Sequence, residues 1–207
     1  MVHLLVSLFC SSLPGGGLFF YPNLAESKDE GISNIQLLLR LDFEKRASEL
    51  HLVFLRMLYA TVVTLMETYL SDAFMNTVLN DKTLVRKLVN EEKEFSERKT
   101  AISDIFERYD NIEEEVAEYL SKLIYHRIPD VSGMYKRVLA IEFPNDLGPV
   151  IEIVKTRHDI VHRNGKTIDG NVIELTNNDI EEVIDVVSIL VRTVEDKLRM
   201  LVRNIRD

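Results

Sequence analysis

The residues best suited to chemistry lie in one short segment, residues 157–165 (RHDIVHRNG). Two arginines, two histidines and an acid fall within one predicted stretch of helix, and no other part of the chain offers this combination. An imidazole titrates near neutral pH and can act as a base or an acid. A guanidinium stays charged and forks onto phosphate oxygens. These groups are suited to cleaving RNA without a metal, because the histidines can transfer protons and the arginines can stabilise the negative charge of the phosphate.

Helical geometry separates the arginine from the second histidine. His158 and His162 share a face, whereas Arg157 lies about 140° from His162 around the axis and about 7.5 Å along it. Val154 and Val161 share the sector of Arg157, so we expect this arginine at a packed or interfacial surface, where it needs an anionic partner. Since one chain supplies one such set, two copies facing each other across a two-fold axis would make a fuller site. The helix that carries the segment and the C-terminal helix are the expected dimer surfaces.

Other interpretations of these residues stay open. Arg157 could instead be the partner of an acid in a buried ion pair. His158 and His162 have the i, i+4 spacing of a metal pair, with Asp159 nearby, but no HExxH pattern or evident third ligand accompanies them, so no metal is predicted. Asp159 could fix a histidine tautomer or pair with Arg163.

Composition favours one helical domain. The chain has 207 residues, 46% of them hydrophobic, with only 8 Gly and 5 Pro, which is too apolar for disorder and too poor in turn formers for a many-stranded fold. A single cysteine, Cys10, predicts a reducing compartment, and the cytoplasm is the expected location. The net charge of -9 argues against nonspecific coating of nucleic acid. Between Lys122 and Lys166, however, eight Lys or Arg face five Asp or Glu, a local excess that suits an RNA-facing cleft.

The N-terminal region is predicted to be an arm of residues 1–30, followed by a helical domain of residues 31–207. Residues 1–13 are apolar but lack the basic start and cleavage site of a signal peptide. They are also too short to span a bilayer, which needs about 20 apolar residues. The run ends at Pro14 and three glycines, so we expect an irregular or strand-like arm and no membrane partner.

A long helix over residues 42–80 is the predicted spine of the core. Apolar residues recur there at spacings of three and four, among them Leu50 and Met57, without Gly or Pro. Arg56 and Glu67 interrupt the run, which favours a central bundle helix over a membrane span. Tyr59 and Tyr69 are expected in the core.

Further helices are predicted on both sides of the motif. Asp81 should cap a helix that ends near residue 94, and Asp146 should cap the motif helix, which Asn164 and Gly165 end. A loop or short hairpin follows, and then a last helix that starts with Thr176 and Asp179 in capping-box spacing. The remaining predicted helices span residues 96–109, 112–126 and 131–141.

The motif resembles a known family. Arg157, four residues and His162 match the R-x4-H form of the HEPN superfamily, and His158 stands where that family favours Asn, Asp or His. The wider string RHDIVHRNG is especially similar to bacterial HEPN proteins of the RiboL-PSP type and to their defence-associated relatives. The resemblance extends over about residues 42 to 206.

This resemblance implies an all-α, up-and-down helical bundle, usually a homodimer, that cuts RNA in a cleft between protomers. Arg157 would then stabilise phosphate charge, His162 would be the acid or base, and His158 would tune or position them. Asp159, Arg163 and Asn164 would be supporting residues. The products would include a 2′,3′-cyclic phosphate, and no cofactor is implied.

The resemblance also bears on partners. It suggests a toxin or defence context with an antitoxin or another partner of the same system. Some HEPN toxins carry a tyrosine two residues after the histidine, but this chain has Asn164, which makes control by AMPylation doubtful. The competing hypothesis is a non-catalytic HEPN module that serves as a scaffold or binds a nucleotide, and the acidic net charge mildly favours it. A nucleotidyl-transfer helper is a third hypothesis, although no phosphate loop or paired-aspartate motif supports it.

Overall fold

The computed structural model describes residues 24–40 and 48–206, and this part of the chain is all-α. Its extended pairing is confined to one isolated bridge between Lys166 and Val172. The predicted fold class is therefore confirmed. In chain order the helical elements are α2 (Leu24–Leu38), α3 (Ser48–Leu79), α4 (Lys82–Glu91), α5 (Lys93–Ser96), the 3-10 turn η2 (Ile102–Asp104), α6 (Ile105–Ser121), α7 (Ile128–Met134), the π-helical segment η3 (Tyr135–Leu139), α8 (Gly148–His162) and α9 (Asn177–Arg206).

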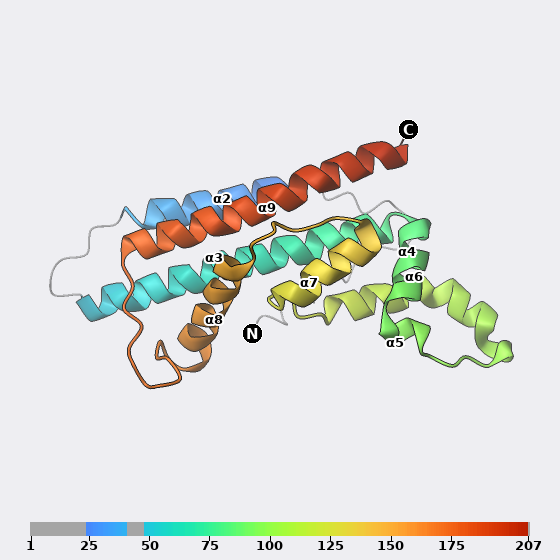
Figure 1. The fold of residues 1–207 in the computed structure, drawn as a ribbon, viewed down its shortest axis with the longest axis horizontal. Helices are drawn as coiled ribbons and strands as arrows, with labels where there is room; N and C mark the ends of the chain where they lie inside the picture. The colour runs from blue at the N-terminus through green and yellow to red at the C-terminus, as the bar shows by residue number, and fades with distance from the viewer. Residues whose placement is uncertain (1–23, 41–47, 207) are drawn as a thin grey trace.

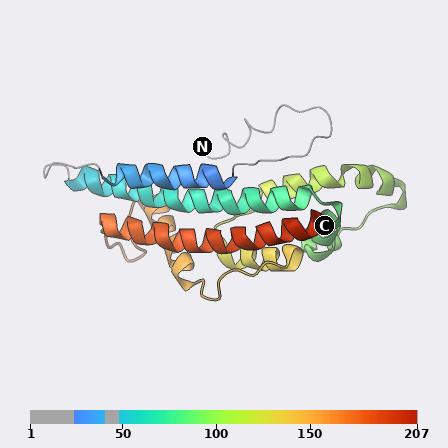
Figure 2. The same cartoon turned by 90° about the horizontal axis from the view of Figure 1, so that it is seen from above.

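Helix α3 is the centre of the bundle. α2, α3 and α9 run lengthwise beside one another, and α8 crosses α3 at a steep angle (Figures 1 and 2). Helices α4 and α6 also pack against α3. Length and apolar composition alone would suit a membrane span. Within the described structure, however, α3 is the helix on which the others pack, as the sequence predicted. Its fully buried side chains are Leu55, Val62, Val63, Met66, Leu70, Phe74 and Val78.

The C-terminal helix α9 forms as its pattern predicts. The Thr176 backbone N–H donates to Asp179 Oδ2 at 2.6 Å, and the Asp179 N–H donates to Thr176 Oγ1 at 3.4 Å, which completes a capping box. One face of the helix is buried against α3, and its opposite face is largely charged. The buried residues are Ile180, Val183, Ile184, Val187, Leu190, Val191, Val194 and Leu198.

The predicted helix pair between residues 96 and 126 is wrong. The structure has one continuous helix, α6, over Ile105–Ser121, and η2 precedes it. No Gly or Pro interrupts this stretch, and Val116 and Leu120 anchor its second half in the core. Helix α4 begins after Asp81, which accepts from the Thr83 N–H at 2.7 Å as predicted, but it ends at Glu91, three residues before the predicted end.

Helix α8 starts differently from the prediction and ends as predicted. Leu147, not Asp146, is its N-cap residue, and the Asp146 carboxylate accepts from the Gly148 N–H at 2.9 Å. Past the end of the helix, Asn164 and Gly165 have φ values of 53° and 72°, in the left-handed region that terminates helices.

The spine helix is not buried along its whole apolar pattern. Tyr59 and Tyr69 are buried, as expected, whereas Leu50 and Met57 are more than 60% exposed. α3 is apolar nearly all round, and the helices that pack on it leave the sector of Leu50 and Met57 open. Periodicity on such a helix cannot indicate which sector stays uncovered.

The N-terminal boundary predicted between residues 30 and 31 falls within α2, which packs on α3 and buries Ile35. The rest of the predicted arm, residues 1–23, and the start of the predicted spine helix, residues 42–47, lie outside the described residues.

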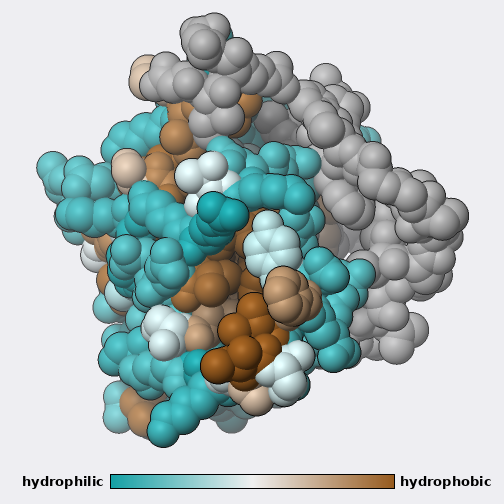
Figure 3. Space-filling model, turned by 90° about the vertical axis from the view of Figure 1, so that its right-hand side faces the viewer, coloured by the Kyte–Doolittle hydropathy of each residue, from teal (hydrophilic) through white to brown (hydrophobic). Residues whose placement is uncertain are grey.

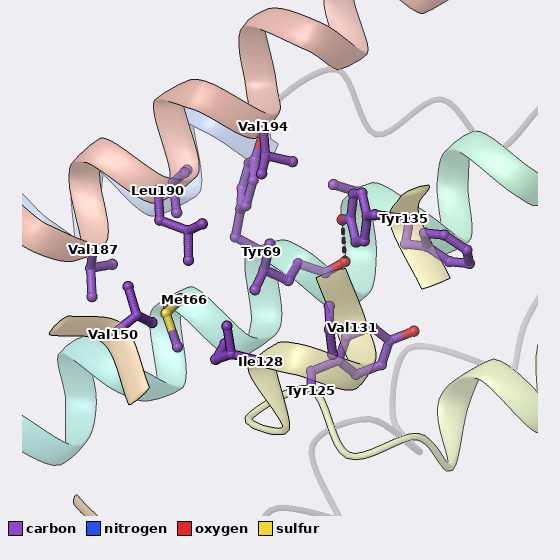
Figure 4. Packing of buried hydrophobic residues seen from close by; sticks show 14 of the residues in the cluster. Met66, Tyr69, Tyr125, Ile128, Val131, Tyr135, Val150, Val187, Leu190 and Val194 are labelled. Atoms are coloured by element: carbon purple, nitrogen blue, oxygen red, sulfur yellow. Dashed lines mark hydrogen bonds between the residues drawn. The ribbon is translucent and has the colours of Figure 1, made fainter. Parts of the chain in front are cut away.

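A buried tyrosine joins α3 to the π-helical segment. Tyr135 is fully buried, and its hydroxyl donates to the Leu70 carbonyl at 2.7 Å (Figure 4). Its ring lies 5.0 Å from the Phe74 ring and 5.1 Å from the Phe143 ring, between centroids. Burial raises the pKa of Tyr135 well above its usual value, so the phenol keeps its proton and its hydrogen bond.

Tyr135→Phe removes this hydrogen bond and keeps the packing. We expect the free energy of unfolding to fall by about 1–2 kcal/mol, measured by urea denaturation. Tyr109→Phe is the matched control, because Tyr109 is exposed and its hydroxyl stays in water. Equal effects of the two substitutions would contradict the role given to the Tyr135 hydroxyl.

Candidate active site

An arginine of α3 holds the end of the motif segment. Arg56 Nη2 donates to the carbonyl oxygens of Gly165 and Ile173, each at 3.1 Å. The Ile173 N–H donates to the same Gly165 carbonyl at 2.9 Å. One cation therefore closes the base of the loop that follows α8, and it fixes the position of the motif helix relative to α3.

Gly165 is the residue that allows this contact. Its N–H lies 3.2 Å from the carbonyl oxygens of Asp159 and Ile160, which caps the helix end. A Cβ atom at this position would overlap the Arg56 guanidinium, and its φ of 72° is rarely adopted by residues with a side chain. Glycine is thus required twice over, by the backbone angle and by the close approach of Arg56.

A second charge of α3 faces the motif arginine. Arg157 Nη2 lies 3.8 Å from Glu67 Oε1, and the same oxygen lies 3.6 Å from His126 Nδ1. The Arg157 and Glu67 side chains are only 17% and 19% exposed. Arg157 was expected to need an anionic partner because it lies in an apolar sector of its helix, and Glu67 is that partner. The ion pair agrees with a structural role for Arg157 as well as with a catalytic one.

This ion pair leaves hydrogen-bonding capacity unused. Arg157 Nε and Glu67 Oε1 are buried, and neither has a hydrogen-bond partner within the described part of the chain. At 3.8 Å the contact is electrostatic and too long for a direct hydrogen bond. Glu67 therefore neutralises the Arg157 charge without saturating its hydrogen-bond donors, and 17% of the side chain remains exposed.

The two motif histidines lie together at the surface. The His158 and His162 rings are 4.6 Å apart between centroids, with 42° between their planes, and both residues are exposed. Arg157 is turned toward α3 and Glu67, so within one protomer the arginine and His162 occupy different sectors of α8, as predicted from helical geometry.

Asp159 is the buried acid of the motif, and it pairs with Arg163 one turn later. This outcome matches one of the two roles considered for Asp159. Asn164 follows with its left-handed backbone and exposed side chain, so its observed role is to end the helix.

A tyrosine adds a further link between α3 and α8. Tyr59 of α3 is buried, and its hydroxyl lies near the side chain of Thr156, the residue before Arg157. Burial raises the pKa of Tyr59 to about 12, so the phenol stays protonated at neutral pH. Tyr59, Arg56 and Glu67 together position α8 along its length.

Sequence reasoning did not assign Arg56, Glu67 or His126 to the site. The available signal was that Arg56 and Glu67 interrupt an apolar helix. They are eleven residues apart, about three turns, so they lie on one face, and that face carries α8. His126 comes from the segment between α6 and α7, and no local pattern places it beside Glu67.

No group of three or more His, Cys, Asp or Glu within residues 24–40 and 48–206 is arranged to hold a metal ion. The His158 and His162 pair, considered above as metal ligands, thus has no third ligand of these types in that part of the chain.

Comparison with known proteins gives one match. The family model described as RiboL-PSP-HEPN matches residues 26–199, which include α3, α8 and most of α9. No curated protein and no solved structure matches the chain.

Gly165→Ala tests the closure of the loop. We expect the free energy of unfolding to fall by at least about 1 kcal/mol more than in Gly170→Ala, measured by urea denaturation. Gly170 has a φ of 84° but open space around its Cβ position, so it carries the backbone strain without the overlap. Equal losses in the two variants would mean that the Arg56 contact adds nothing.

Proposed function

Because the chain belongs to the RiboL-PSP-HEPN family, whose domains are often ribonucleases, we propose that it is a metal-independent endoribonuclease that uses Arg157 and His162. The observation that carries this proposal is the state of Arg157. Its guanidinium is held at a fixed position beside Glu67, yet its Nε is buried with no hydrogen-bond partner among the described residues. The exposed 17% of the Arg157 side chain is the part that an RNA phosphate would contact, and the buried contact with Glu67 would hold the guanidinium in position for it.

The proposed reaction needs only groups of the protein and the RNA. The 2′-hydroxyl oxygen attacks the adjacent phosphorus, the bond from phosphorus to the 5′-oxygen breaks, and a 2′,3′-cyclic phosphate and a free 5′-hydroxyl form. One imidazole accepts the 2′-hydroxyl proton, and an imidazolium donates a proton to the leaving 5′-oxygen, so that the protons balance. The Arg157 guanidinium stabilises the extra negative charge on the phosphate oxygens.

His162 is the proposed acid or base, and His158 is proposed to position it. Both are exposed and their rings lie 4.6 Å apart, so the His158 ring is close enough to hold the His162 imidazole in place. Arg163 is held by Asp159 and stays near the helix end as a supporting cation.

The site is proposed to be completed by a second copy of the chain. Arg157 and His162 occupy different sectors of α8, so a two-fold axis beside this helix would bring the arginine and histidine sets of two protomers into one cleft. Helix α3 has an exposed apolar stripe formed by Leu50, Val53 and Met57. This stripe lies beside the face of α3 that carries α8, because Met57 is only about 100° around the helix from Arg56. This stripe is the proposed dimer surface together with α8.

The contribution of α9 to the dimer is proposed to be small. Its apolar face is used in the core of the protomer, and its outward face is mostly charged, with Ile189 and Met200 as exposed apolar residues. This assignment refines the expectation that both the motif helix and the C-terminal helix form the dimer surface.

A second candidate function is a non-catalytic scaffold or nucleotide-binding module. The specific observation in its favour is that Arg157 already has an acidic partner, Glu67. In this alternative the motif arginine fixes α8 on α3, and its positive charge is not used on RNA. The cellular context proposed for either function is a bacterial defence or toxin system in the cytoplasm.

The nuclease proposal predicts that Arg157→Ala and His162→Ala each lower RNA cleavage in EDTA by about 100-fold or more, because each removes a group that acts in the transition state. Cleavage is followed on single-stranded and structured RNAs, and product ends are analysed for cyclic phosphate. Lys155→Ala is the matched control, since it removes an exposed cation of the same helix. Unchanged cleavage in both motif variants would eliminate the proposed site, and no cleavage by the wild type would favour the scaffold.

The dimer proposal predicts that Met57→Asp yields monomers in sedimentation analysis and also abolishes cleavage, because a charge is placed in the apolar interface. Met200→Asp is the control, since Met200 is equally exposed but lies on α9. Dissociation by Met200→Asp and not by Met57→Asp would place the interface on α9. Circular dichroism verifies that both variants fold.

A further inference from the structure

The turn η2 and the first half of α6 expose an apolar surface that the described bundle does not cover. Ile102 and Phe106 are 85% and 80% exposed, and Ile105 and Tyr109 beside them are also open to solvent. Figure 3 looks onto this end of the molecule and shows a hydrophobic area surrounded by hydrophilic surface. Large apolar side chains gathered on an exposed surface commonly mark a binding site. We call these four residues the α6 patch.

The patch continues the core face of α6 beyond the core. Ile105, Tyr109 and Val116 are separated by four and seven residues, so they lie on one face of the helix. Val116 is fully buried, and the second half of α6 packs against α3 and α4. The first half of the helix extends past these partners (Figures 1 and 2). The same face that joins α6 to the bundle is therefore available to another molecule.

The charge around the patch is strongly one-sided. Residues 91–121 contain eleven Asp or Glu and four Lys or Arg, a net charge of -7 in a chain whose total is -9. Three of these acids, Glu92, Glu113 and Glu118, pair with cations outside this range, and the region stays acidic after these pairs are counted.

Asp110 lies only about 40° around α6 from Phe106, and it is exposed and forms no ion pair with another described residue, whereas Glu107 and Glu114 lie on the side of the helix opposite Val116. Glu115 is paired with Arg98 at 3.1 Å and Arg108 at 3.9 Å.

An exposed apolar patch in an acidic region favours one kind of binding partner. A second copy of the same end would bring two surfaces of like charge together, which opposes association. RNA and anionic lipid are polyanions and are repelled for the same reason. A partner with both apolar and basic side chains would bury the patch and compensate the unpaired Asp110.

We propose that the α6 patch binds a basic amphipathic helix of a partner protein. Apolar side chains of the partner, spaced at i, i+3 or i+4 and i+7, pack on Ile102, Phe106 and Tyr109. Lys or Arg residues along one flank of that helix face Asp110, which adjoins Phe106 on α6. The aromatic residues of the patch carry most of the affinity, and Asp110 sets the orientation of the partner. This binding surface goes beyond the proposed nuclease and does not depend on it, because α8 lies in a different part of the bundle.

The test uses the full chain and a designed, fluorescently labelled peptide with leucines at i, i+3, i+4 and i+7 and lysines along one flank. Fluorescence polarisation measures its affinity. We expect saturable binding that weakens as salt is raised, and at least about tenfold weaker binding of both a scrambled peptide of equal composition and a peptide with glutamates in place of lysines. Equal binding of the scrambled or the acidic peptide would overturn the proposal.

Variants of the chain locate the binding surface. Phe106→Ser, in an exposed residue that leaves the core intact, is expected to weaken binding at least about tenfold. Asp110→Lys is expected to weaken it and to reduce its salt dependence. Ile189→Ser and Glu181→Lys are the controls, because they change an exposed apolar residue and an exposed acid of α9.

The remaining outcomes decide against the proposal. Unchanged binding by Phe106→Ser with intact circular dichroism would place the peptide elsewhere. Loss of self-association in this variant would assign the patch to a second copy of the chain. Sedimentation of the wild type, but not of Phe106→Ser, with phosphatidylcholine vesicles would assign it to a lipid surface.

Discussion

Two charges on α3 determine where the motif helix lies. Arg56 and Glu67 stand three turns apart on one face of an otherwise apolar helix, and each would be costly to bury without a partner. α8 and the loop after it provide those partners, carbonyl oxygens for the arginine and Arg157 for the glutamate. A sliding or rotated α8 would lose both contacts at once. Hydrophobic packing alone would tolerate several orientations, whereas these charges specify one.

The charge of the chain is unevenly distributed along its sequence. Residues 122–166, which include the motif helix, have an excess of basic residues, while residues 91–121 hold most of the net negative charge. An overall charge of -9 therefore says little about either surface. An acidic region away from the motif also disfavours RNA binding outside the basic area, which would restrict polyanions to the part of the surface that carries Arg157.

Several local signals predicted helix ends correctly, although the cap at Asp146 and the helix pair between residues 96 and 126 were wrong. The capping box at Thr176, the cap at Asp81 and the left-handed residues after α8 depend on neighbours within a few positions, and all three are confirmed. The contacts of Arg56, Glu67 and His126 join residues far apart in the chain. The spacing of residues within one helix cannot predict such contacts. The same limit explains Met57, which belongs to the apolar pattern of the predicted spine helix and is exposed in the structure. Which apolar residues are covered is decided by where the other helices pack.

The loop between Gly165 and Ile173 is tied at its base and open at its tip. The Ile173 N–H and Arg56 hold the two ends, while Ile168, Asp169 and Gly170 are exposed. A change in the number of residues at the tip would add only a small loop-closure cost and would leave the tied ends in place. The tip is thus a natural position for length variation among relatives, and it is a suitable point at which to insert an epitope or a fluorescent label beside the motif helix without altering its geometry.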